Sequence, residues 1–153
     1  MNWIFRYFYQ LTLALWVGGM TCFAFLVTPL VFSNLGRDEA AKIVGFLFPV
    51  YYPVMAGVSL AALIFYFLHQ RAEGFFYKLG ILLLVTAVLI NLYQYIILFP
   101  QAAQLQAQIG SFEAMARENP LRQSFAKLHI QANLLGLLVL IEGYVLLFFA
   151  GRK

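Results

Sequence analysis

The chain has 153 residues, of which 63% are hydrophobic and 10% charged, and its mean hydropathy is +0.84. These values exclude an ordinary soluble domain and predict a protein of the lipid bilayer. The net charge of +4 is scattered over short connections and forms no basic stripe, so we expect no nucleic-acid partner. Cys22 is the single cysteine, which excludes an intramolecular disulfide and a cysteine-based metal cluster.

Four apolar stretches are each long enough to cross a bilayer as a helix, which takes about 20 residues. The predicted spans are 7–32, 43–70, 78–100 and 126–150, joined within one domain of residues 1–153. The polar connection 101–125 has glutamines at helical spacing and predicts an amphipathic helix. We therefore predict an all-α integral membrane fold: an antiparallel four-transmembrane-helix bundle with an extra amphipathic helix between spans three and four.

The first span is too long for the apolar core of a signal peptide, and no small-x-small cleavage site follows it. We expect it to be retained and to end near Pro29 or a little beyond, before a turn over 33–36. In the second span, breakers and small residues recur at every fourth position and share one face. Four small residues of these two spans are predicted to pack against neighbouring helices: Gly18, Gly19, Gly57 and Ala61. The alternative is that glycine and proline are simply common in membrane helices.

Turn-forming residues divide the second half of the chain. A tight hairpin is expected over 69–78, and the third helix should continue beyond the membrane and turn at Gly110-Ser111. Asn119-Pro120 predicts a break before the last span. The two halves resemble each other in outline, and Pro29 and Pro100 would correspond.

The basic residues leave the orientation nearly undecided. The side with the two termini carries Arg6, Arg71, Lys78, Arg152 and Lys153; the other side carries Arg37, Lys42, Arg117, Arg122 and Lys127. Basic residues are denser in the shorter segments of the first side, which favours cytoplasmic termini.

Glu142 is the only acid well inside a predicted span. A charge at that depth is costly, so an acid there is a functional hypothesis by default. We expect a structural pair with Arg6 or a hydrogen bond with Gln10. The alternative is a proton or cation site, although a single acid makes a poor relay.

Polar residues also gather near one membrane side of spans three and four. Helical spacing places Arg122, His129 and Asn133 on one face of the last span, together with Phe125 and Gly136. A second set near the end of span three could meet them. The predicted polar patch comprises Asn91, Gln94, Tyr95, Arg122, His129 and Asn133. It is either interhelical glue or a binding pocket.

The two histidines argue against a bis-histidine haem, because four spans place His69 and His129 at opposite membrane faces, about 30 Å apart. No metal site is predicted, since His129 has no suitable partners nearby. We predict no cofactor. A quinone would need an aromatic-lined cleft with His129 near its head group.

Two motifs carry a resemblance to a known family. The opening Trp16-Val17-Gly18-Gly19, followed by Phe23 and Pro29, resembles the W-x-G-G…P pattern of small bacterial membrane proteins labelled domain of unknown function 4149. That family is related to the vertebrate transmembrane protein 205. Phe125, Leu128, His129 and Asn133 resemble its F-x-x-L-H-x-x-S-x-x-N signature, with Gln131-Ala132 departing from it. The resemblance implies a four-helix membrane fold and no reaction, and with it we expect a bacterial inner-membrane location. It marks six positions: Trp16, Gly19, Pro29, Phe125, His129 and Asn133.

No catalytic motif is present, so an enzyme is not favoured. The function that we expect first is an accessory or scaffold subunit, with lipid and a larger membrane complex or further copies of the chain as partners. The alternatives are a small homo-oligomeric transporter or channel, and a haem- or quinone-linked redox component.

Overall fold

In the computed structural model, residues 2–69 and 74–151 are described, and they are helical apart from short connections, with no strand in those ranges. Two of the four long rods contain a short π-helical segment. The first rod is α1 (Asn2–Cys22), η1 (Phe23–Val27) and α2 (Thr28–Asn34), and the second is α3 (Arg37–His69). The third rod is α4 (Phe75–Tyr93), η2 (Gln94–Leu98) and α5 (Phe99–Ile109), and the fourth is α6 (Pro120–Gly151).

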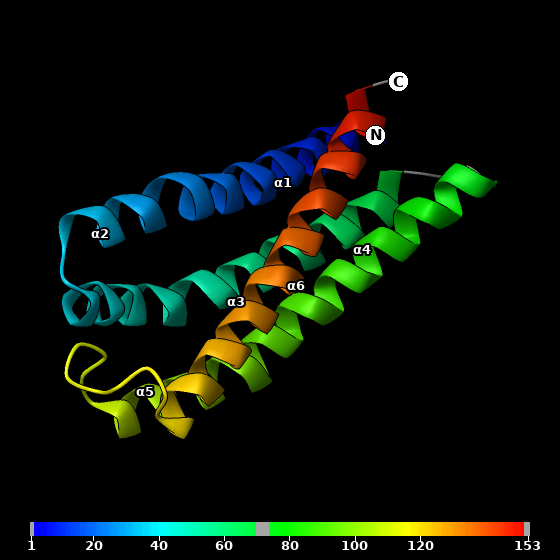
Figure 1. Cartoon of the computed structure of the whole chain (residues 1–153). Helices are drawn as coiled ribbons and strands as arrows, with labels where there is room; N and C mark the ends of the chain where they lie inside the picture. Colours follow the sequence, from blue (N-terminus) through cyan, green and yellow to red (C-terminus); the bar gives the residue numbers. More distant parts are fainter. Residues whose placement is uncertain (1, 70–73, 152–153) are drawn as a thin grey trace.

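Each rod is long and apolar enough to span a membrane, and successive rods run in opposite directions (Figure 1). The predicted all-α, four-span fold is thereby confirmed. The helix α1 packs against α3 and α6, while α4 packs against the same two helices from the other side. The core between them is formed by large side chains that are fully buried, among them Leu13, Trp16, Leu84 and Leu146.

The turn after α5 uses a glycine where the backbone requires one. Gly110 ends α5 with a φ of 69°, and its N–H donates to the carbonyl of Gln106, as expected for a helix stopped by a left-handed residue. The third helix therefore continues beyond the predicted span and turns at Gly110, as predicted. The connection is irregular over 110–119, and α6 begins at Pro120. The predicted hairpin at 69–78 falls partly on 70–73, outside the described residues.

The connection 110–119 is fastened to the start of α3 by reciprocal hydrogen bonds. The Asp38 carboxylate accepts from Ser111 Oγ at 2.5 Å and from the backbone N–H of Phe112 at 2.6 Å. In return, Glu113 Oε1 accepts from the N–H of Arg37 at 2.8 Å and so satisfies a free donor of the first turn of α3. The two connections at this end of the bundle thus hold each other in place.

Of the predicted packing residues, Gly19 makes a close helix contact, because a Cβ there would lie 2.9 Å from Met55 Cε. Ala61 is half-buried. Gly18 and Gly57 make no such contact within the described chain, where nothing lies within 4 Å of an added Cβ. The reason is rotational: Gly19 faces α3, whereas its neighbour Gly18 is on the exposed side of α1.

Both halves of the chain contain a five-residue π-helix just before a proline. The segment η1 precedes Pro29 and η2 precedes Pro100, in the equivalent register. A proline cannot donate to residue i−4, and its ring clashes with that carbonyl, so a wider turn ahead of it relieves the clash. The helices consequently pass through these prolines and continue to Asn34 and Ile109.

Candidate functional site

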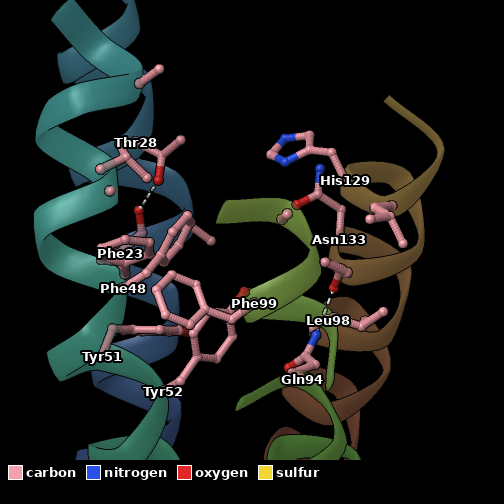
Figure 2. Close-up of a pocket in the computed structure, with 18 of the residues that line it drawn as sticks. Phe23, Thr28, Phe48, Tyr51, Tyr52, Gln94, Leu98, Phe99, His129 and Asn133 are labelled. Atoms are coloured by element: carbon pink, nitrogen blue, oxygen red, sulfur yellow. Dashed lines mark hydrogen bonds between the residues drawn. The ribbon is translucent and has the colours of Figure 1, made fainter. Parts of the chain in front are cut away.

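A cavity of about 590 Å³ lies at the end of the bundle where α2 and α6 stand apart (Figure 1). One wall is formed by η1, α2 and α3, and the other by η2, α5 and α6 (Figure 2). Both π-helical segments contribute to the lining, Phe23 from η1 and Gln94 from η2. Short π-helical insertions are frequent at functional sites, because they re-aim the side chains of one turn.

Aromatic rings form the floor and one wall of the cavity. The ring of Phe23 stacks on Tyr51 with centroids 4.3 Å apart, and Phe48 packs against Tyr52 at 5.2 Å. Phe99 of α5 reaches Tyr52 at 5.8 Å and so links the two walls (Figure 2). Helical spacing places Phe48, Tyr51 and Tyr52 on one face of α3, and this face lines the cavity. Because these side chains are aromatic, this wall of the cavity is largely apolar.

The opposite wall carries polar side chains. His129 and Asn133 are one turn apart on α6, and both project into the cavity (Figure 2). Gln94 Nε2 donates to the carbonyl of Ala132 at 2.7 Å, which fixes η2 against α6. Gly136 follows on the same face, and an added Cβ there would meet only Gln94 Nε2, at 3.8 Å. On this wall, the side chains of His129 and Asn133 can therefore donate hydrogen bonds to a molecule in the cavity.

Two arginines line the edge of the cavity and precede the predicted spans. Arg37 is the first residue of α3, and Arg122 lies in the first turn of α6. Arg122 Nη1 donates to the carbonyl of Met115 at 2.5 Å. The hydrogen bond from Ser111 is the main reason why the pKa of Asp38 lies below its usual range. Backbone N–H groups and the nearby Arg122 charge add to this effect, against the opposing effect of burial.

The structure brings together four of the six residues of the predicted polar patch: Gln94, Arg122, His129 and Asn133 line the cavity. Asn91 lies apart from that lining, buried, where its Nδ2 donates to Ser59 Oγ at 3.3 Å. Tyr95 is 38% exposed and is not among the lining residues. Asn91 thus acts as interhelical glue, while the other four residues belong to a pocket.

The motif positions are distributed over the core, the exposed surface and the cavity. Trp16 is fully buried, and its Nε1 donates to Met20 S at 3.0 Å. Pro29 is exposed on the outer side of α2. Phe125 lines the cavity between Phe112 and His129, with ring centroids 4.9 Å and 6.0 Å away respectively.

Glu142 has a different partner from the two predicted. Its Oε1 accepts from Thr86 Oγ1 of α4 at 2.7 Å, whereas Gln10 Nε2 is directed to the carbonyl of Ala150 at 3.4 Å. The predicted pairing with Arg6 or Gln10 is therefore wrong. The cause is the rotation of α6, which presents Glu142 to α4, while Gln10 of α1 lies beside Ala150, about two turns beyond Glu142 on α6.

Among residues 2–69 and 74–151, no group of three or more His, Cys, Asp or Glu side chains could hold a metal ion. His69 ends α3 near the termini and packs on the ring of Tyr9 at 5.1 Å, while His129 lines the cavity near the other end of the bundle.

Sequence reasoning missed the aromatic half of the site and Arg37. A signal was present, since three aromatic residues recur at spacings of three and four between 48 and 52. Such a stripe in a membrane helix is equally typical of lipid-facing or core packing. Its function as a cavity wall depends on the divergence of α2 from α6.

Fold and site together define a small four-span helical membrane protein with one end opened into an aromatic cavity. The chain belongs to the family of the domain of unknown function DUF4149, whose model matches residues 11–111. That match includes Trp16, Gly19 and Pro29 but ends before His129 and Asn133. No curated protein and no solved structure matches the chain.

Proposed function

We propose that this chain is a non-enzymatic membrane protein that binds one amphiphilic molecule of the bilayer in the cavity between its two walls. The observation that carries the proposal is the composition of the cavity lining, which is aromatic and aliphatic inside and carries polar and basic groups at one edge. Small-molecule sites have volumes of about 300–1,000 Å³, apolar walls and a few placed polar groups. The cavity of about 590 Å³ falls within that range.

The position of the cavity supports an amphiphile over a soluble ligand. Arg37 and Arg122 precede the predicted spans, at the depth where arginine and aromatic residues favour the membrane interface. Phe23, Tyr52 and Leu140 line the part that lies within the spans. A molecule with one polar and one apolar end matches both parts.

Native mass spectrometry of the protein, extracted from its membrane in mild detergent, tests the proposal. We expect a retained molecule of lipid mass on the parent chain. Gly136→Phe places a ring in the cavity and should remove most of that bound mass. Leu138→Phe is the matched control, because Leu138 lies on the same helix, is 45% exposed and does not line the cavity. Equal bound mass on both variants would overturn the proposal.

Binding of an amphiphile is compatible with the proposed roles as accessory or scaffold subunit and as a homo-oligomeric transporter. The subunit content of the extracted particle separates them. Larger chains in fixed stoichiometry support an accessory subunit, and copies of this chain alone support the transporter. A relation to the vertebrate transmembrane protein 205 and a bacterial inner-membrane location stay predictions.

One observation favours a second candidate, a quinone-linked redox component. The aromatic lining and the side chain of His129 beside it support this candidate, because a quinone head group would need both. Extraction of the purified protein with organic solvent, followed by chromatography of prenylquinones, tests it directly.

A further inference from the structure

We propose that the head group of the bound molecule is an anionic phosphate, held between Arg37 and Arg122, so that the ligand is an anionic phospholipid of the surrounding bilayer. This inference rests on the proposed binding function and names the ligand class of the same cavity.

The first argument is the charge of the lining. Two arginines line the cavity, and the described residues that line it include no carboxylate. The two acids at this end have other partners: Asp38 of α3 accepts from Ser111 and Phe112, and Glu113 of the connection 110–119 accepts from the backbone of Arg37. The guanidinium groups are therefore the charged groups that a ligand in the cavity would meet.

The second argument is the placement of the arginines on opposite walls. Arg37 begins α3 and Arg122 lies in the first turn of α6, yet both line the same cavity. Arg122 is close enough to Asp38, the neighbour of Arg37, for its charge to lower the pKa of that carboxyl. Arg37 is exposed and Arg122 is half-buried, with one nitrogen engaged by Met115. A phosphate between the walls could accept from both guanidinium groups, a geometry that arginine suits.

The third argument separates a lipid from a free anion. His129 and Asn133 follow Arg122 along α6 and project into the cavity (Figure 2), where they could donate to the ester oxygens of a phospholipid. Beyond them the lining is formed by Phe23, Tyr52 and other apolar side chains. Inorganic phosphate would leave that surface without a ligand, whereas acyl chains would cover it.

The test is a competition in detergent between phosphatidylglycerol and phosphatidylcholine with identical acyl chains, read by native mass spectrometry. We expect the parent chain to retain phosphatidylglycerol in preference. Arg37→Gln and Arg122→Gln should each lower that preference by roughly fivefold, the effect of one basic residue near an anionic membrane surface. Arg122→Lys, which keeps the charge, should retain part of it.

Arg117→Gln is the matched control, since Arg117 is an exposed arginine of the connection 110–119 that does not line the cavity. Arg37→Gln leaves the backbone hydrogen bond to Glu113 intact, so its thermal midpoint should equal that of the parent. Equal retention of both lipids by the parent, preferential retention of a neutral prenylquinone, or full displacement by inorganic phosphate would each overturn the head-group assignment. If Gly136→Phe still removes the bound mass, the proposed function survives that failure. If Gly136→Phe retains the bound mass, the proposed function and the head-group assignment are both overturned.

Discussion

Glu142 is a buried acid with an incomplete set of hydrogen bonds. Its side chain is 6% exposed, and one carboxyl oxygen accepts from Thr86. The other oxygen, Oε2, is buried and makes no hydrogen bond with the residues that the structure describes. A buried polar atom without a partner costs about 1–3 kcal/mol, more than one ordinary hydrogen bond returns. The unpaired oxygen of Glu142 therefore lowers the free energy of unfolding at the interface between α4 and α6.

We expect Glu142→Met to raise the free energy of unfolding by about 1 kcal/mol, because it removes the unpaired oxygen at similar volume. Thr86 keeps its acceptors, the carbonyls of Leu82 at 2.9 Å and Leu83 at 3.0 Å. The measurement is the thermal midpoint in a fixed detergent, with Glu142→Gln as the polar control. A midpoint several degrees below that of the parent would contradict the prediction, because it would mean that the carboxyl contributes more stability than its unpaired oxygen costs.

At the scale of elements, the connection 110–119 and the start of α3 behave as one unit. Asp38 binds the connection through Ser111 and Phe112, and Glu113 of the connection binds the first N–H of α3. The same unit carries Arg37 and positions Arg122 through the carbonyl of Met115. The edge of the cavity is thus held by hydrogen bonds between two connections distant in sequence.

The pKa of Asp38 is lowered in the folded state, chiefly by the hydrogen bond from Ser111, so this unit should be sensitive to acid. An unfolded aspartate has a pKa of about 3.9. The stabilisation is therefore complete above that pH and is lost as the pH falls through the lower, folded value. We expect proteolysis within 110–119 to accelerate as the pH falls below about 3.9.

Asp38→Asn should lose most of this acid dependence and be cleaved faster than the parent at neutral pH, because an amide accepts these hydrogen bonds more weakly than a carboxylate. Glu39→Gln is the control, since Glu39 is exposed in the same turn. The same cleavage rate in the parent and Asp38→Asn at neutral pH would contradict the assigned role of the carboxylate.

The sequence predicts those elements that depend on local chemistry. The four spans follow from apolar length, and the stop at Gly110 and the start at Pro120 follow from backbone stereochemistry. What could not be predicted depends on the rotation and crossing of helices. The partner of Glu142, the open surroundings of Gly57 and the aromatic wall at Tyr51 all require knowledge of which helix faces which.

Only the polar half of the cavity lining could be predicted from the sequence, because the other half depends on how the helices are arranged. His129 and Asn133 stand out because polar residues are rare in membrane helices. Arg37 resembles any interfacial arginine, and the aromatic residues resemble any packing stripe. Only the separation of α2 from α6 turns them into the lining of one cavity (Figure 1).

For the whole molecule, the arrangement of the rods fixes which ends share a membrane side. The third rod extends from Phe75 to Ile109, 35 residues, and so is roughly 50 Å long at about 1.5 Å per residue. This exceeds the hydrocarbon thickness of about 30 Å, so we expect residues beyond its two ends on opposite sides of the membrane. Basic residues number five on each side of the predicted topology, counted from the sequence, so charge bias decides the orientation only weakly.

We expect Lys78→Cys and Arg117→Cys, each in a Cys22→Ala background, to react oppositely with a membrane-impermeant thiol reagent in intact cells. Lys78 is exposed in the first turn of α4, and Arg117 is exposed in the connection 110–119. With cytoplasmic termini, Arg117→Cys is labelled in intact cells and Lys78→Cys only after permeabilisation. The reverse pattern would overturn the orientation and leave the bundle intact. Labelling of both sites from one side would contradict the antiparallel arrangement itself, because no four-span path places the two ends of the third rod together.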